Sequence, residues 1–351
     1  MLAALLPRVE GEGDPPGHVQ QAEVLKRNDQ YARQNHYSIG APDRMYHIMH
    51  DGITLVTAFF PIGRGEWTGK AQRSDDKYFK YFQHWARIHN DLVVYTTPEN
   101  AERIRQIRLS FGRTNTQVYI VNDLEDIDKS MYTLMHDVGK HYPKYSLFPD
   151  KPEVSNPIYD FVMYTKFWCL AQASTVAATN KIAWIDFGFD HGGEYYKDNQ
   201  WFDRTWNYTR PNGKVALFQI RELPSDPIFD CIRRTETYIQ GNCIELDTDY
   251  AQQFYVDVRN QYEHLLRCGL LDDDQIILLM CHYEKPDIYC CLPSRWFSML
   301  DEYRDDKKTG MHSDLLPEFF IISRRRRWYW TKHCLKFLKQ EFNHLVRRYP
   351  L

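Results

Sequence analysis

Residues 181–191 read KIAWIDFGFDH, and this stretch predicts the fold more directly than any other. Its first half is apolar and contains two isoleucines, as in strands that are buried on both faces of a parallel sheet. Asp186 follows the apolar run, and Asp190 and His191 come within the next five residues. Three glycines allow a tight turn and a close approach of a ligand: Gly188, Gly192 and Gly193. The stretch therefore predicts a buried strand that ends at a ligand site.

Similar apolar runs predict further strands of the same sheet. Strands are predicted over residues 53–60, 91–98, 117–123 and 181–188, with helices over residues 99–108 and 159–174. Beyond residue 190 the pattern loosens into extended segments at 215–223 and 237–246 and helices at about 249–268 and 274–282. Strands with helices between them indicate βαβ units. We expect an α/β, Rossmann-like fold with a mostly parallel central sheet flanked by helices.

The chain is predicted to have three parts. Residues 1–50 are polar and form an N-terminal extension, with a helix at about 18–34; residues 51–322 form the α/β domain; residues 323–351 form a basic amphipathic C-terminal helix. The 351 residues contain no apolar run of the roughly 20 residues that span a bilayer. The N-terminus lacks the basic segment of a secretory signal, and the eight cysteines include no CxxC pair. These features predict a cytoplasmic protein.

The C-terminal part is strongly basic. From Ser323 onward it has nine Lys and Arg against one acid, although the whole chain has a formal charge of −3. Its apolar side chains recur at helical spacing: Trp330, Cys334, Leu338, Phe342 and Leu345. A basic amphipathic helix with aromatic residues is typical of a membrane surface, so we expect peripheral membrane contact through residues 324–351. The alternative is a helix that packs this stripe onto the domain. No recognised nucleic-acid-binding module accompanies the tail, so no nucleic-acid partner is predicted.

Asp186 is the first candidate for chemistry, because ligands bind at the carboxyl ends of the strands in open parallel sheets. A carboxylate buried there needs a positive partner, and a divalent ion bridging to a diphosphate would supply it. Oxygen ligands suit Mg²⁺ or Mn²⁺. The predicted metal ligands are Asp186 and Asp190, with His312 or His282 as a third. The alternative is that both acids cap a turn or helix.

Three other segments carry candidate residues. Lys166 lies in the apolar helix before the strand and either meets phosphate or extends to solvent as an ordinary lysine. Gly241-Asn242 marks a point where a backbone passes close to a neighbour, or a bulge without a ligand. Residues 272–275, DDDQ, precede a helix, and its acids fit N-capping. Only one cap is needed, so Asp273 or Asp274 is a candidate general base.

Six segments in the same order resemble the HtrL/YibB family. They are ITLVTAFFPIGR, VVYTTPENAERI, MYTKFWCLA, IAWIDFGF, YIQGNCIEL and DDDQIILL, and the resemblance spans about residues 53–295. Members of that family are found near bacterial surface-glycan genes and look like GT-A-type glycosyltransferases. GT-A enzymes hold a nucleotide-sugar through an Asp-x-Asp signature and a divalent ion. Here Asp186 takes the first position, but Gly188 stands at the second.

The resemblance also implies binding roles. The nucleotide-sugar-binding residues would be Thr57, Ala58, Phe59, Arg64, Lys166, Asp186, Gly241, Asn242 and Gln275, with Asp273 or Asp274 as the base or an acceptor-binding acid. We therefore expect a glycosyltransferase that moves a sugar, with a UDP-sugar favoured, to a hydroxyl of a glycan or lipid-linked acceptor. Inversion is slightly favoured. The alternatives are a metal-dependent phosphohydrolase and a non-catalytic glycan-binding protein.

Overall fold

The computed structural model describes residues 49–207, 214–301, 335, 338–339 and 341–346. In that part of the chain seven strands form one sheet, in the order β3-β2-β1-β4-β6-β5-β7. The strands are β1 (His50–Phe59), β2 (Leu92–Thr96), β3 (Thr116–Ile120), β4 (Thr179–Ile185), β5 (Val215–Gln219), β6 (Ile239–Asp247) and β7 (Tyr289–Pro293). Strand β6 is antiparallel to both of its neighbours, and the other four pairings are parallel.

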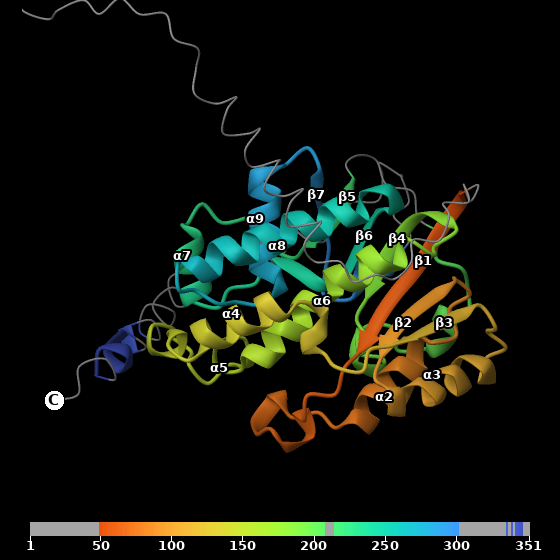
Figure 1. Cartoon of the computed structure of the whole chain (residues 1–351), viewed down its shortest axis with the longest axis horizontal. Coiled ribbons are helices and arrows are strands. Elements are labelled where there is room, and N and C mark those ends of the chain that lie inside the picture. Colours follow the sequence, from red (N-terminus) through yellow and green to blue (C-terminus); the bar gives the residue numbers. More distant parts are fainter. Residues whose placement is uncertain (1–48, 208–213, 302–334, 336–337, 340, 347–351) are drawn as a thin grey trace, which may run out of the picture. The chain divides into compact units, whose positions relative to one another are not determined.

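Helices cover both faces of this sheet. They are α2 (Asp75–Trp85), α3 (Pro98–Ser110), α4 (Lys129–Gly139), α5 (Pro152–Ser155), α6 (Pro157–Ala173), α7 (Ile228–Arg233), α8 (Ala251–Arg267) and α9 (Asp274–Glu284). Figure 1 shows α4, α6 and α8 packed side by side over one face, with α2 and α3 on the other. The predicted α/β class with a mostly parallel central sheet flanked by helices is confirmed.

Adjacent residues of the central strands enter two separate cores. In β1, Val56 packs into the core under α4, α6 and α8, whereas Leu55 packs into the core under α2 and α3. In β4, Ile182 and Ala183 divide in the same way. Side chains of a strand alternate between its two faces, so a strand covered on both must be apolar throughout. This is why β1 and β4 read as continuous apolar runs.

The four strands predicted in the first half of the domain are present, and so are the extended segments that became β5 and β6. Helix α2 and strand β7 were not predicted. Helix α2 begins with a recognisable cap, because the Ser74 side chain accepts a hydrogen bond from the Lys77 amide. Strand β7 is a short pairing with β5 at the edge of the sheet, and its sequence, YCCLP, carries little strand signal.

Part of the basic C-terminal segment is described, and residues 341–346 are helical. Leu338 and Phe342 are 62% and 66% exposed, and Leu345 is also exposed. Glu341 forms an ion pair with Arg233, which attaches this helix to the domain through a charged contact. These apolar side chains are therefore not packed on the domain. The predicted helix at 18–34 and residues 302–334 lie outside the described residues. In the described part no helix is long and apolar enough to span a bilayer.

Candidate functional site

A cavity of about 150 Å³ lies at the carboxyl ends of β1 and β4. It is lined by residues 58–62, where β1 ends, and by residues 186–188, directly after β4. The two strands are parallel neighbours, with β2 and β3 on one side of β1 and β4 on the other. The order of the strands along the chain thus reverses between β1 and β4. In open α/β sheets such a switch point is where ligands bind.

The wall of this cavity combines charged groups with aromatic rings. Its polar, charged and Tyr side chains are Arg64, Arg73, Asp75, Tyr78, Tyr159, Thr165, Lys166, Asp186 and His191. They come from the segment between β1 and α2, from the start of α2, from α6 and from the turn after β4. A cavity with both kinds of group can hold a ligand that has an anionic part and a ring.

Lys166 lies in the middle of α6 and is buried between two carboxylates. Its Nζ is 3.1 Å from Asp186 Oδ1 and 2.7 Å from Asp274 Oδ2. It also donates to the carbonyl oxygen of Gly241 at 2.9 Å. An ammonium group has three N–H donors, and these contacts use all of them. The lysine therefore joins α6, the end of β4 and the start of α9.

The charge of Lys166 is set by its neighbours. Burial alone would lower the pKa of its ammonium group, but the charges of Asp186 and Asp274 more than offset burial and raise it above the ordinary value. The lysine is therefore a fixed positive charge at neutral pH. With two carboxylates within ion-pair distance, it is the electrostatic centre of the site.

Gly241 in β6 allows the ion pair to form. A Cβ atom at this position would overlap the carboxylate of Asp274. The pairing of β5 with β6 is also irregular between Leu217 and Phe218, which are opposite this point. Both interpretations of Gly241 from the sequence therefore apply. The strand is irregular here, and its backbone passes close to the side chain of Asp274.

Asp186 is held from two sides but keeps access to the cavity. Its amide donates to the carbonyl of Asn242 at 2.9 Å, and its Oδ1 accepts from Trp184 Nε1 at 2.7 Å as well as from Lys166. Oδ2 has no hydrogen-bond partner among the described residues, and the side chain is 33% exposed. One carboxylate oxygen is thus engaged by the protein, and the other can accept a hydrogen bond from a ligand.

Asp190 has a different environment, although it is only four residues away. Its carboxylate is fully buried and accepts the amides of Tyr195 and Tyr196 at 2.6 and 3.0 Å. Asp190 and His191 both have left-handed backbone conformations, with φ of 56° and 46°. Such turns are strained for these residues, and the two hydrogen bonds stabilise this one. Asp190 does not line the cavity, whereas His191 does.

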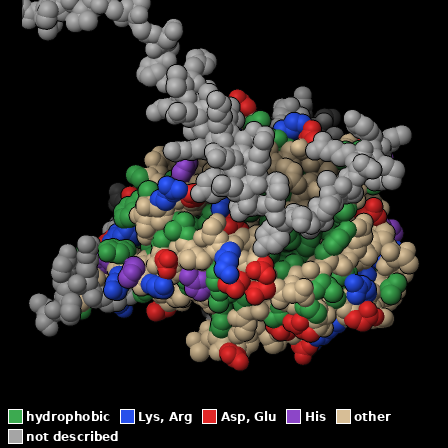
Figure 2. All heavy atoms as spheres, in the orientation of Figure 1, with side chains coloured by type: hydrophobic (Ala, Val, Ile, Leu, Met, Phe, Trp, Pro, Cys, Tyr) green, Lys and Arg blue, Asp and Glu red, His purple; other side chains and the backbone are tan. Residues whose placement is uncertain are grey.

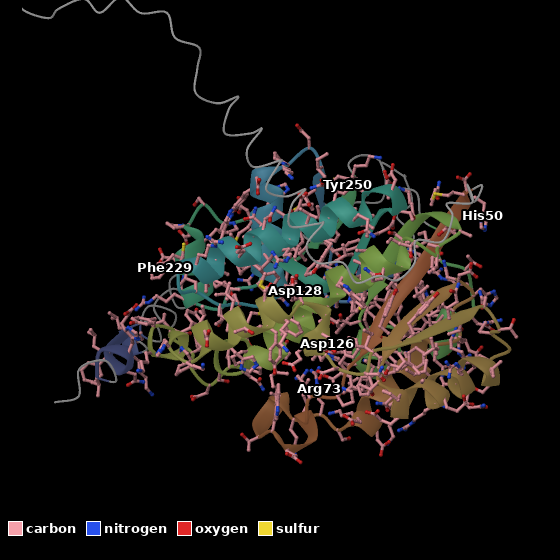
Figure 3. All side chains as sticks on the ribbon, in the orientation of Figure 1. His50, Arg73, Asp126, Asp128, Phe229 and Tyr250 are labelled. Atoms are coloured by element: carbon pink, nitrogen blue, oxygen red, sulfur yellow. The ribbon has the colours of Figure 1, made fainter. Side chains whose placement is uncertain are left out.

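Two arginines add positive charge to the wall of the cavity. Arg64 donates to the hydroxyl of Tyr78 and to the carbonyl of Ala71, and its guanidinium lies 4.9 Å from the ring centre of Trp67. Its Nε is buried without a partner. Arg73 is half-buried, and its side chain has no hydrogen bond or ion pair within the described part of the chain. Figure 3 marks Arg73 on the segment between β1 and α2.

The acids before α9 lie behind Lys166 and do not line the cavity. Asp273 caps the helix by accepting the amide of Gln275 at 3.0 Å, and Asp272 accepts the amide of Asp273 at 2.9 Å. Asp160 on α6 is also fully buried, and neither of its oxygens has a partner among the described residues. Burial, and then the charge of Asp273, raise the pKa of the Asp160 carboxyl well above its usual range.

The structure brings together only some of the residues named from sequence. Those that line the cavity are Ala58, Phe59, Arg64, Lys166 and Asp186. Those that contact Lys166 or Asp186 from behind are Gly241, Asn242 and Asp274. Those that lie elsewhere are Thr57, which is buried in β1, Asp273 and Gln275, which form the helix cap, and Asp190, which holds the turn. His282 bonds the carbonyl of Tyr289, and His312 lies outside the described residues.

Sequence reasoning did not identify Arg73, Tyr78 or Tyr159 as site residues. Arg73 directly precedes the cap of α2, so recognising that helix start would have placed it beside the end of β1. Tyr159 lies in the first turn of α6, where apolar neighbours hide it in the pattern. On the face that Figure 2 shows, described Lys and Arg side chains lie among Asp and Glu. The concentration of positive charge in the C-terminal tail is not repeated there.

Comparisons with known proteins give a family model, a sequence relative and a structural likeness. A family model described as "Bacterial protein of unknown function (HtrL_YibB)" matches residues 51–305. Protein HtrL of Escherichia coli (strain K12) is 28% identical over 281 residues, covering 74% of this chain and 94% of that protein. The structure of 4-diphosphocytidyl-2C-methyl-D-erythritol synthase from Anaerococcus prevotii DSM 20548 covers 76% of this chain and 93% of its own, with 9% identity and a TM-score of 0.35. That last likeness is too weak to bear on function.

Proposed function

The chain belongs to the HtrL_YibB family of bacterial proteins, and from this premise we propose that it is a nucleotide-sugar-dependent glycosyltransferase. The observation that carries the proposal is the cavity at the switch point between β1 and β4. Arg64 and Arg73 line this cavity together with Asp186, a carboxylate that keeps one oxygen available. A nucleotide-sugar has the matching groups, because it combines a diphosphate, hydroxyls and a planar base.

Each part of such a donor has a complement in the cavity. Guanidinium groups bind phosphate oxygens with paired N–H donors, which suits Arg64 and Arg73. The open oxygen of Asp186 suits a ribose or sugar hydroxyl. Aromatic side chains such as Tyr78 and Tyr159 offer ring faces against which a base or a sugar packs.

The proposed reaction is a displacement at the anomeric carbon of the donor. The bond between that carbon and the diphosphate oxygen breaks, and the nucleoside diphosphate leaves with the bonding electron pair. The acceptor hydroxyl oxygen forms the new bond and gives up its proton to a base. Negative charge develops on the diphosphate, and fixed cations directed at that charge are usually the strongest source of catalysis.

We propose Asp75 as the base, in place of Asp273 or Asp274. Asp75 lines the cavity at the first residue of α2, whereas the other two acids are buried behind Lys166. Burial, and then the neighbouring charge of Asp76, raise the pKa of the Asp75 carboxyl. A carboxylate that binds a proton more readily is a better general base.

A thermal-shift screen tests donor binding. The full chain is heated with UDP, GDP, CDP or TDP and with the corresponding nucleotide-sugars. A ligand at about 100 times its Kd stabilises the folded state by about 2.7 kcal/mol, which raises Tm by several degrees. The Asp186→Asn variant should lose most of this shift, while Asp137→Asn, a substitution on the exposed surface of α4, should keep it. No shift with any of these ligands would contradict the proposal.

The acceptor is proposed to be a glycan or lipid-linked glycan at an anionic membrane surface, as in the synthesis of surface polysaccharides. Support comes from the C-terminal helix, whose Leu338 and Phe342 side chains are exposed. The segment that contains them is basic, with nine Lys and Arg against one acid. Apolar side chains beside basic ones favour insertion at an anionic lipid surface.

Vesicle binding tests this part of the proposal without a truncation. The double variant Leu338→Ser/Phe342→Ser should co-sediment less with vesicles that contain phosphatidylserine, because apolar burial is lost. Leu109→Ser, at an exposed leucine on α3, is the matched control and should co-sediment like the unmodified chain. Equal co-sedimentation of all three proteins would show that the helix does not bind the membrane.

A further inference from the structure

We infer that this site binds the diphosphate of its donor through protein cations and without a divalent metal ion. Arg64 and Arg73 would bind the phosphates, and Lys166 would take the place at Asp186 that a metal ion takes in sites built on paired acids. The inference rests on the proposed function, because it names the groups that bind the donor.

The described residues do not fit a divalent ion at this strand end. Mg²⁺ and Mn²⁺ need several oxygen ligands with free lone pairs. Asp186 Oδ1 already accepts from Trp184 and Lys166, and both oxygens of Asp190 accept backbone amides. Within the described ranges no group of three or more His, Cys, Asp or Glu side chains is arranged to hold a metal ion. The second acid of the Asp-x-Asp signature is replaced by Gly188.

Lys166 also opposes a metal ion by its charge. Its ammonium is 3.1 Å from Asp186 Oδ1, so an ion bound to that oxygen would meet a fixed like charge at close range. The lysine cannot move aside without breaking two further contacts, with Asp274 and with the Gly241 carbonyl. The ammonium of Lys166 thus provides the positive partner that the Asp186 carboxylate needs, and it does so from the buried side.

The two arginines of the cavity supply the charge that the diphosphate requires. Arg64 and Arg73 have no acidic partner among the described residues, and each phosphate group of a diphosphate diester carries one negative charge. Arg64 is already fixed by its bonds to Tyr78 and Ala71 and still has an unused Nε donor. A guanidinium held in place before the ligand arrives loses little conformational entropy on binding. The two arginines would also stabilise the charge that develops on the leaving diphosphate.

Calorimetric titration tests the inference on the full chain. UDP, GDP, CDP and TDP are titrated into protein treated with EDTA and into protein supplied with Mn²⁺. We expect at least one of them to bind with a Kd that differs by less than about twofold between the two conditions, because the binding cations belong to the protein. Binding in Mn²⁺ that disappears in EDTA would overturn the inference and leave the proposed function standing. Absence of binding in both conditions would overturn both.

Variants test which residues act. Arg73→Ala should weaken binding in EDTA by about tenfold or more, as expected for lost charge-assisted hydrogen bonds. Arg73→Gln keeps most of the side chain and should show a similar loss, which separates charge from packing. Arg105→Ala, on the exposed side of α3, and His312→Ala should bind like the unmodified chain. Unchanged binding by both Arg73 variants, or a loss with His312→Ala, would overturn the assignment.

Discussion

Lys166 separates two acidic regions that differ in access to solvent. On one side Asp186 is one-third exposed and lines a cavity that two arginines also line. On the other side Asp272, Asp273 and Asp274 are all nearly or fully buried, and Asp274 is in contact with Lys166. The residue type is the same in both regions. Access and counter-charge therefore decide which carboxylate can meet a ligand and which one only supports the fold.

This difference also explains why the run of three acids was a poor guide to catalysis. In sequence the acids before α9 are more conspicuous than the single Asp186. In the structure Asp273 caps the helix and Asp274 is the counter-ion of Lys166, so each has a structural role. The variants below test this division, beginning with the one expected to have the largest effect.

Removing the central charge should be the most damaging change. Lys166→Met leaves the carboxylates of Asp186 and Asp274 without their buried partner, and breaking such a pair typically costs about 3–5 kcal/mol. Chemical denaturation measures this loss. The double variant Lys166→Met/Asp274→Asn should be more stable than Lys166→Met alone, because one unpaired charge is gone.

A surface ion pair provides the control for this experiment. Lys140 and Asp137 are 2.7 Å apart on the exposed side of α4. Exposed pairs contribute little, so Lys140→Met should leave the denaturation midpoint unchanged within error. If Lys166→Met were equally mild, the buried pair would not be the centre of the site.

Gly241→Ala should have the next largest effect. The added methyl group overlaps the Asp274 carboxylate and forces it away from Lys166, and overpacking of this kind costs about 1–3 kcal/mol. Gly65→Ala is the matched control, because a Cβ there meets only ordinary contacts with Ser74. A Gly241→Ala protein as stable as the control would show that β6 and α9 are not packed as described.

The buried acids should affect the pH dependence of stability. Burial raises the pKa of the Asp160 carboxyl, so the folded state binds a proton that the unfolded state releases above about pH 4. Stability contributed by this group is therefore present at low pH and is lost as pH rises towards the pKa in the folded state.

Asp160→Asn should remove this loss of stability at higher pH. The free energy of unfolding should then fall less steeply between pH 5 and pH 8, by up to about 1.4 kcal/mol per pH unit. Asp137→Asn, on the exposed surface, should leave the slope in this range unchanged. An unchanged slope in Asp160→Asn would mean that the carboxyl is charged in the folded protein as well as in the unfolded one.

Much of the fold could be predicted from sequence because both faces of the sheet are covered. Double coverage makes β1 and β4 apolar throughout, and such runs are easy to recognise. The antiparallel direction of β6 and the short strand β7 depend on long-range pairing, which local patterns do not contain.

Part of the candidate site could also be predicted from the sequence. The rule that ligands bind at strand ends identified Asp186 and the end of β1 correctly as neighbours. The three contacts of Lys166 come from β4, β6 and α9, which only the folded chain brings together. The Asp190 carboxylate accepts two backbone amides, whereas among the described residues the Asp186 carboxylate accepts only from the side chains of Trp184 and Lys166. The sequence does not contain that difference.

A crystal structure with the nucleoside diphosphate that raises Tm most would test the central claim most directly. The account predicts phosphate oxygens within hydrogen-bond distance of the guanidinium groups of Arg64 and Arg73, and a ligand hydroxyl on Asp186 Oδ2. It also predicts that Lys166 keeps its contact with Asp186. A diphosphate bound elsewhere on the chain, or bound here with Lys166 displaced from Asp186 by a metal ion, would contradict it.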